Sequence, residues 1–196
     1  MYKKQMKFQR IACFAFLAAA AIVFIYSLGL VTDLYEALYS TMDYLNPKYD
    51  AVDGARIFYD IQPFNSMLTT AALILIGCSV LVFITNTHSR RKYYLANYIT
   101  VGLSCVANLA VAIWTAINVA KYKLQYQTTI DFEALKEYSE IWKTLYIGPN
   151  DTFWFDIGFV VSAILIIVSA LAVFNLIWKT LLMKEEKRLI KEGLEG

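Results

Sequence analysis

The chain has 196 residues, of which 59% are hydrophobic, 15% aromatic and 17% charged. A soluble domain is nearer half apolar and a quarter charged, so this composition indicates a membrane protein. The formal net charge of +2 argues against a nucleic-acid binder that relies on basic charge. Eight glycines and three prolines exclude collagen-like and low-complexity material.

Four apolar stretches are each long enough, at about 20 residues, to cross a hydrocarbon core of about 30 Å. They cover residues 11–31, 67–85, 98–120 and 155–178. The first stretch follows a basic segment, as a signal peptide would. However, it is longer than a usual signal-peptide core and no A-x-A cleavage site follows it. We therefore interpret it as a retained signal-anchor.

Basic residues are unevenly distributed over the segments that flank these stretches. The N-terminal segment, the short loop 87–96 and the tail 179–196 together hold twelve Lys and Arg, whereas the long loops 32–66 and 121–154 hold six. An excess of Lys and Arg marks the cytoplasmic side of a membrane protein. We therefore expect a multi-pass protein of the plasma membrane, of the bacterial cytoplasmic type. Both termini would be cytoplasmic and both long loops would lie outside.

The long loops carry helical signals of their own. Apolar positions at helical spacing predict one helix over residues 11–45, which Asn46-Pro47 would end, and residues 55–62 are expected to form a short strand or extended segment. Residues 121–127 would prolong the third stretch.

A separate amphipathic helix would begin at a cap, Thr129 or Asp131, and Gly148-Pro149-Asn150-Asp151 would end it before the fourth stretch. The fourth stretch would continue into the tail as a helix that Gly193 ends. The sequence thus predicts an all-α integral membrane protein with four transmembrane helices, N-in and C-in. Residues 1–196 would form a single domain, with a small, mainly helical, extracytoplasmic cap made by the two long loops.

Groups that carry common membrane chemistry are missing from the apolar stretches. None has an Asp, Glu, Lys, Arg or His at bilayer depth, which disfavours an autonomous pump or a proton relay. Cys13, Cys78 and Cys105 form neither a C-x-x-C pair nor a metal-ligand spacing, so we expect them to be packing residues. We predict no catalytic residue, no metal site and no cofactor.

A polar stripe follows the third stretch at helical steps of three, four and seven residues. Its members are Asn97, Thr100, Ser104, Asn108, Thr115 and Asn118. Two interpretations are open. The stripe could form contacts between helices through amide and hydroxyl hydrogen bonds, or it could line a hydrophilic path. The absence of a charged ring favours helix contacts.

Aromatic residues are concentrated in the long loops. The first loop contains five tyrosines: Tyr35, Tyr39, Tyr44, Tyr49 and Tyr59. Because tyrosine is enriched at protein interfaces, we predict a partner interface; its members are Tyr35, Tyr39, Tyr44, Tyr59 and Trp142. The alternative is that these rings pack the cap or lie at the lipid boundary.

Three functions are compatible with this sequence. The first is a non-enzymatic accessory or scaffold subunit of a larger membrane complex, such as a transporter, bound through the spans and the tyrosine-rich cap. The second is a homo-oligomeric pore or facilitator lined by the polar stripe. The third is a membrane enzyme that acts on lipid through the carboxylates Asp33, Asp60 and Asp156. The expected partners are membrane lipid and either a membrane protein or further copies of this chain, with no nucleic acid.

Overall fold

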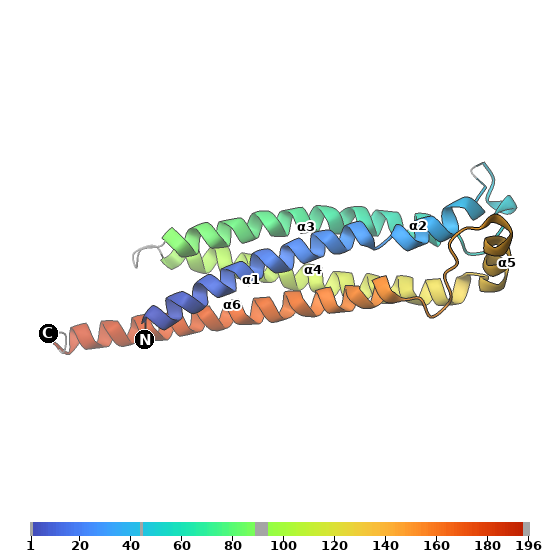
Figure 1. Ribbon diagram of the computed structural model, residues 1–196. Helices are drawn as coiled ribbons and strands as arrows, with labels where there is room; N and C mark the ends of the chain where they lie inside the picture. The colour runs from blue at the N-terminus through green and yellow to red at the C-terminus, as the bar shows by residue number, and fades with distance from the viewer. Residues whose placement is uncertain (1, 44, 89–93, 194–196) are drawn as a thin grey trace. The chain divides into compact units, whose positions relative to one another are not determined.

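The computed structural model describes residues 2–43, 45–88 and 94–193, and this part of the chain contains helices and no strand (Figure 1). The all-α class is therefore confirmed. The elements in chain order are α1 (Tyr2–Gly29), α2 (Thr32–Leu38), the 3-10 helices η1 (Tyr39–Thr41) and η2 (Pro47–Tyr49), α3 (Ile57–His88), α4 (Tyr94–Thr129), α5 (Phe132–Trp142) and α6 (Phe153–Lys191).

Within the described residues, four helical segments are long and apolar enough to cross a membrane. They are Lys3–Thr41, Ile57–Asn86, Asn97–Thr129 and Phe153–Lys191. Each contains one of the predicted apolar stretches and extends beyond it. For example, α6 has 39 residues, and at a rise of 1.5 Å per residue it measures about 58 Å, roughly twice the thickness of a hydrocarbon core. The chain therefore has the helices of a multi-pass membrane protein.

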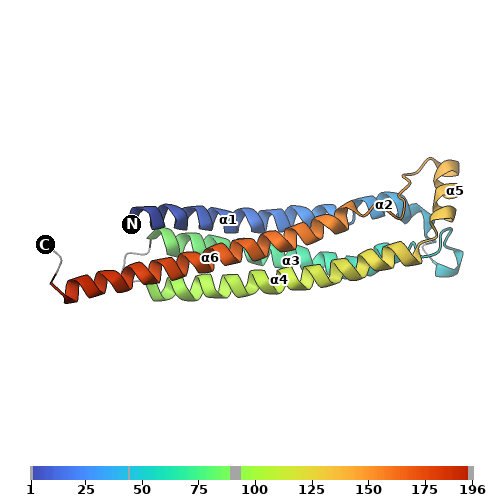
Figure 2. The same ribbon diagram turned by 90° about the horizontal axis from the view of Figure 1, so that it is seen from below.

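The helices contribute to two compact units. The terminal unit consists of Met1–Ala21, Leu73–Ala110 and Ala163–Gly196, and the loop unit consists of Ile22–Ala72 and Val111–Ser162. Segments of α1, α3, α4 and α6 run side by side within each unit (Figures 1 and 2). The loop unit also contains α2 and α5.

Small residues on α1 allow close packing in the terminal unit. Ala12 and Ala19 are buried, and Phe16 between them is 1% exposed. On the opposite side of the helix, Ile11 and Phe14 are more than half exposed, at 56% and 60%. An apolar outer face of this kind suits contact with lipid tails, while small residues let neighbouring helices approach closely.

The single helix predicted over residues 11–45 is wrong, because the backbone breaks after Gly29. A Cβ atom at Gly29 would lie 2.3 Å from the Trp154 ring, so the chain passes this ring only with glycine there. Val31 leaves the helical conformation, at φ −107° and ψ 1°, and the Thr32 hydroxyl donates to the Gly29 carbonyl at 2.7 Å. α2 begins at this point, and the chain becomes extended at Met42, before Asn46-Pro47.

The strand or extended segment predicted over residues 55–62 is also wrong, because α3 begins at Ile57. Ile57, Ile61, Phe64 and Leu68 are buried, with exposed fractions of 1%, 0%, 4% and 0%. Their steps of four, three and four residues are those of one helix face. The segment 55–62, considered alone, is too short for this helical period to be recognised in the sequence.

The remaining local predictions agree with the structure except for the end of α5. α4 continues to Thr129, as expected from residues 121–127. α5 begins after Asp131, whose carboxylate accepts hydrogen bonds from two backbone N–H groups of the first turn, at 3.1 and 3.0 Å. This helix ends earlier than predicted, at Trp142, and the next residue, Lys143, adopts φ 56°. α6 runs to Lys191 and is followed by Gly193 at φ 67°.

Candidate functional site

Three of the predicted interface tyrosines meet in the loop unit, where they surround Phe58. The ring of Phe58 is 7% exposed and its centroid lies 5.7 Å from Tyr35, 6.1 Å from Tyr39 and 5.3 Å from Tyr59. The rings of Tyr35 and Tyr39 also contact each other, at 4.9 Å. The three tyrosines remain 50%, 45% and 41% exposed. We call Tyr35, Tyr39, Phe58 and Tyr59 the aromatic patch.

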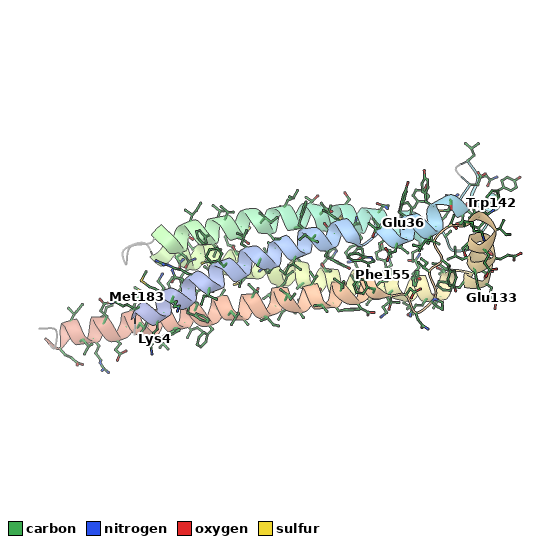
Figure 3. All side chains as sticks on the ribbon, in the orientation of Figure 1. Lys4, Glu36, Glu133, Trp142, Phe155 and Met183 are labelled. Carbon is green, nitrogen blue, oxygen red and sulfur yellow. The ribbon has the colours of Figure 1, made fainter. Side chains whose placement is uncertain are left out.

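Trp142, another of the predicted interface residues, belongs to a second aromatic pair next to this patch. Its ring lies 6.1 Å from Tyr138, one turn earlier on α5. The Tyr138 hydroxyl donates to the carbonyl of Ser40 at 2.8 Å, which joins α5 to the residue after Tyr39. Trp142 is 66% exposed, and Figure 3 labels it on α5. Tyr44 lies outside the described residues.

A charged turn lies between η1, which carries Tyr39, and α3, which carries Phe58 and Tyr59. Arg56 donates to both carboxylate oxygens of Asp50, from Nε at 2.7 Å and Nη2 at 3.0 Å, and to the Asp43 carbonyl at 2.9 Å. Burial on its own would raise the pKa of Asp50. However, the hydrogen bonds from Arg56 and from the Asp43 N–H hold that pKa below its ordinary value. The ion pair is therefore formed at neutral pH and fixes the turn that precedes α3.

The two long loops contact each other through their backbones. The N–H of Asp131 donates to the Asp53 carbonyl at 3.0 Å. Gly54 has φ 79°, and a Cβ atom there would lie 2.1 Å from the Thr129 carbonyl oxygen. This position requires glycine both for its backbone conformation and for the close approach.

The three outer-loop carboxylates considered for an enzyme lie in separate environments. Asp60 accepts a hydrogen bond from Gln125 at 2.8 Å. Asp156 forms an ion pair with Lys123 at 2.6 Å and accepts from the Thr152 hydroxyl at 2.7 Å. Asp33 is an exposed residue in the first turn of α2. Among the described residues, no group of three or more His, Cys, Asp or Glu side chains is arranged to hold a metal ion.

The polar stripe of α4 lies mostly inside the helix packing of each unit. Asn97, Ser104 and Asn108 are buried in the terminal unit, and Thr115 is buried in the loop unit, each 3% exposed or less. Thr100 and Asn118 are half-buried. A pore on an axis between copies would need this stripe on an outer face, whereas four of its six members are buried inside the units.

A cluster of buried amides in the terminal unit is not apparent from the sequence. Gln5 on α1 donates to the Asn175 side chain on α6 at 2.9 Å and to Gln9 at 3.1 Å, and Gln9 donates to the Asn86 carbonyl on α3 at 2.8 Å. These hydrogen bonds link three helices. In the sequence, the two glutamines are four residues apart and therefore lie on one helix face. They stand among basic residues, however, so the segment looks like a solvent-exposed flank of the first apolar stretch.

Lys179 and two small cavities adjoin the same region of the terminal unit. Lys179 is 5% exposed, and its Nζ lies 3.4 Å from the Asn97 side-chain oxygen. It follows the predicted fourth stretch by one residue and was expected at the start of the solvated tail. The cavities measure about 20 and about 10 Å³, and Gln9, Cys13 and Asn86 line both. A cavity of this size has room for about one water molecule.

Comparison with known proteins identifies no relative. No protein-family model, curated protein or solved structure matches the chain.

Proposed function

We propose that this chain is a non-enzymatic accessory or scaffold subunit that binds a larger membrane protein, such as a transporter. The observation that carries the proposal is the aromatic patch. Its three tyrosines are about half exposed although the contacts with Phe58 already restrict their rings. A partner that covers ordered side chains loses less conformational entropy than one that must immobilise them. Tyrosine is also among the residues enriched at interfaces.

The proposed interface extends from the patch to Trp142. The hydrogen bond between Tyr138 and Ser40 brings α5 beside Tyr39, so one partner surface could cover both. Large, exposed aromatic side chains of this kind are typical interface anchors. The burial of the polar stripe supports helix packing, and a pore lined by that stripe is the less supported alternative.

We also propose that both termini are cytoplasmic and that the aromatic patch is outside, in the plasma membrane. The exposed lysines Lys3, Lys4 and Lys7 begin α1, and further basic residues end α6, all within the terminal unit. This distribution supports the orientation through the positive-inside rule. In the sequence, the basic residues of the loop 87–96 also support this orientation. They lie within residues 89–93, which are outside the described part of the chain.

The test is affinity purification of the tagged chain from its own membranes in a mild detergent, followed by native mass spectrometry. We expect the wild-type chain to retain a larger membrane protein at a fixed stoichiometry. The double variant Tyr35→Ala/Tyr59→Ala removes two patch rings and should lose that protein. Tyr49→Ala is the matched control, because Tyr49 is 73% exposed and does not belong to the patch.

One result would contradict the accessory function, and another would contradict its proposed interface. A closed ring made of this chain alone would favour the homo-oligomeric pore. Equal retention of the partner by the double variant and the control would show that the patch is not the interface. Retention by the variants is compared only after size-exclusion chromatography has shown that they remain folded.

A further inference from the structure

One face of α6 in the terminal unit carries a row of apolar residues that ends in a pair of lysines. Its apolar members are Ile166, Ala170, Val173 and Ile177, and Thr180, Lys184 and Lys187 continue the row. Consecutive members are three or four residues apart, so the row follows a single face of the helix.

The apolar part of this row forms a groove with α4. Leu109 on α4 faces Ile166, Val173 and Ile177 across a space of about 380 Å³. These four side chains are between 37% and 55% exposed, which leaves the groove open to its surroundings. Because the groove is apolar and faces outward from a membrane-spanning helix, hydrocarbon is the material it is suited to hold.

The polar part of the row forms a second groove of about 160 Å³, lined by Tyr98, Thr180, Met183, Lys184 and Lys187. The hydroxyls of Tyr98 and Thr180 are hydrogen-bonded to each other, which joins α4 to α6 at this point. Both lysines are exposed. Figure 3 labels Met183 on α6.

Helix geometry aligns the two grooves. Tyr98 and Leu109 are eleven residues apart on α4, which is about three turns, so they lie on nearly the same face. Lys184 and Val173 are also eleven residues apart, a distance of about 16 Å along α6. That distance is close to the depth of one leaflet, which is half of a hydrocarbon core of about 30 Å.

The charged side chains that line this second groove, Lys184 and Lys187, are both positive. The adjacent acids Glu185 and Glu186 are rotated by about 100° and about 200° from Lys184, because each helical residue turns the chain by about 100°. The two lysines therefore lie on the face of α6 beside the groove, and the two acids between them in the sequence lie on other faces of the helix.

We propose that the paired grooves between α4 and α6 bind one anionic phospholipid. Lys184 and Lys187 hold its phosphate, the Tyr98 and Thr180 hydroxyls lie next to the headgroup, and an acyl chain follows the apolar groove past Ile177 toward Val173. Basic residues between membrane helices bind anionic headgroups by charge, and an adjoining apolar surface can contact the acyl chain. This proposal is independent of the accessory function, because it concerns the terminal unit and not the aromatic patch.

The test measures lipid retention by native mass spectrometry. The purified full chain is equilibrated with mixed micelles that contain equal amounts of phosphatidylglycerol and phosphatidylcholine of the same chain length. We expect one phosphatidylglycerol to be retained in preference to phosphatidylcholine. Lys184→Gln/Lys187→Gln should reduce this preference by about tenfold or more, since each lysine near an anionic headgroup strengthens the binding of that lipid. Lys3→Gln/Lys4→Gln removes the same charge from exposed positions on α1 and should keep the preference.

A second variant tests the acyl-chain groove. Ala170 is exposed, so Ala170→Phe should fold while its ring fills the apolar groove. We expect it to lower the retention of long-chain phosphatidylglycerol severalfold. Equal retention of the two lipids by the wild-type chain would overturn the proposal. Loss of the preference in the Lys3/Lys4 control, or unchanged retention in Ala170→Phe, would overturn it as well.

Discussion

At the scale of single residues, two helical glycines differ sharply in their surroundings. A Cβ atom at Gly158 on α6 would lie 2.4 Å from the Tyr26 hydroxyl and 2.8 Å from a methyl group of Val119. At Gly77 on α3 it would meet nothing within 4 Å. Gly158 is therefore a contact point of three helices within the loop unit, and Gly77 is not a packing position.

We expect Gly158→Ala to destabilise the chain by about 1–3 kcal/mol, because the added methyl group forces Tyr26 or Val119 to move in a packed interior. Gly77→Ala should be neutral or stabilise the chain by up to about 1 kcal/mol, since alanine favours a helix over glycine. Thermal unfolding in detergent measures both. Equal melting temperatures for the two variants would contradict the close approach at Gly158.

At the scale of elements, α5 depends on its N-terminal cap and on two anchors. The Asp131 carboxylate caps the helix, the Asp131 N–H bonds to Asp53, and Tyr138 bonds to Ser40. Leu135 and Ser139 form its buried side, at 0% and 7% exposed. A helix of 11 residues is short enough that such end contacts decide its stability.

We expect Asp131→Ala to cost α5 about 1 kcal/mol, the usual contribution of an N-cap side chain. Hydrogen exchange of the amides of Glu133 and Ala134, which Asp131 caps, should become about fivefold faster. Asp131→Ser keeps a capping oxygen and should show exchange close to that of the wild-type chain. Unchanged exchange in Asp131→Ala would show that the tertiary anchors alone hold the first turn.

At the scale of the whole molecule, the number of crossings fixes the relation between the chain ends. If each of the four apolar helices crosses the membrane once, the number of crossings is even and both termini lie on one side. The proposed orientation then puts both termini on the cytoplasmic side.

The orientation can be measured by cysteine labelling in intact cells, in a background where the three natural cysteines are replaced by alanine. We expect Tyr49→Cys to react with a membrane-impermeant maleimide added from outside. Lys191→Cys should react only after the membrane is permeabilised. Both positions are exposed, so access to the reagent depends on the side of the membrane. The reverse pattern would place the termini outside and overturn the proposed orientation.

The sequence by itself determined the helices whose signals are local. Continuous apolar stretches predicted the four long apolar helices, the cap candidates Thr129 and Asp131 predicted the start of α5 to within two residues, and Gly193 predicted the end of α6. The prediction from sequence failed where the backbone conformation coincides with contacts to residues distant in the sequence. At Gly29, where α1 ends, an added Cβ atom would meet the Trp154 ring, and the buried face at the start of α3 continues to Leu68.

Only the tertiary structure decided which polar and aromatic residues act together. The sequence identified Tyr35, Tyr39 and Tyr59 as interface candidates, but their common contact with Phe58 required the packing of α2 and η1 against α3. The bond between Gln5 and Asn175 joins residues 170 positions apart. Local patterns report the conformation of a segment, since they arise from neighbours along one helix. They do not report which other segment covers it.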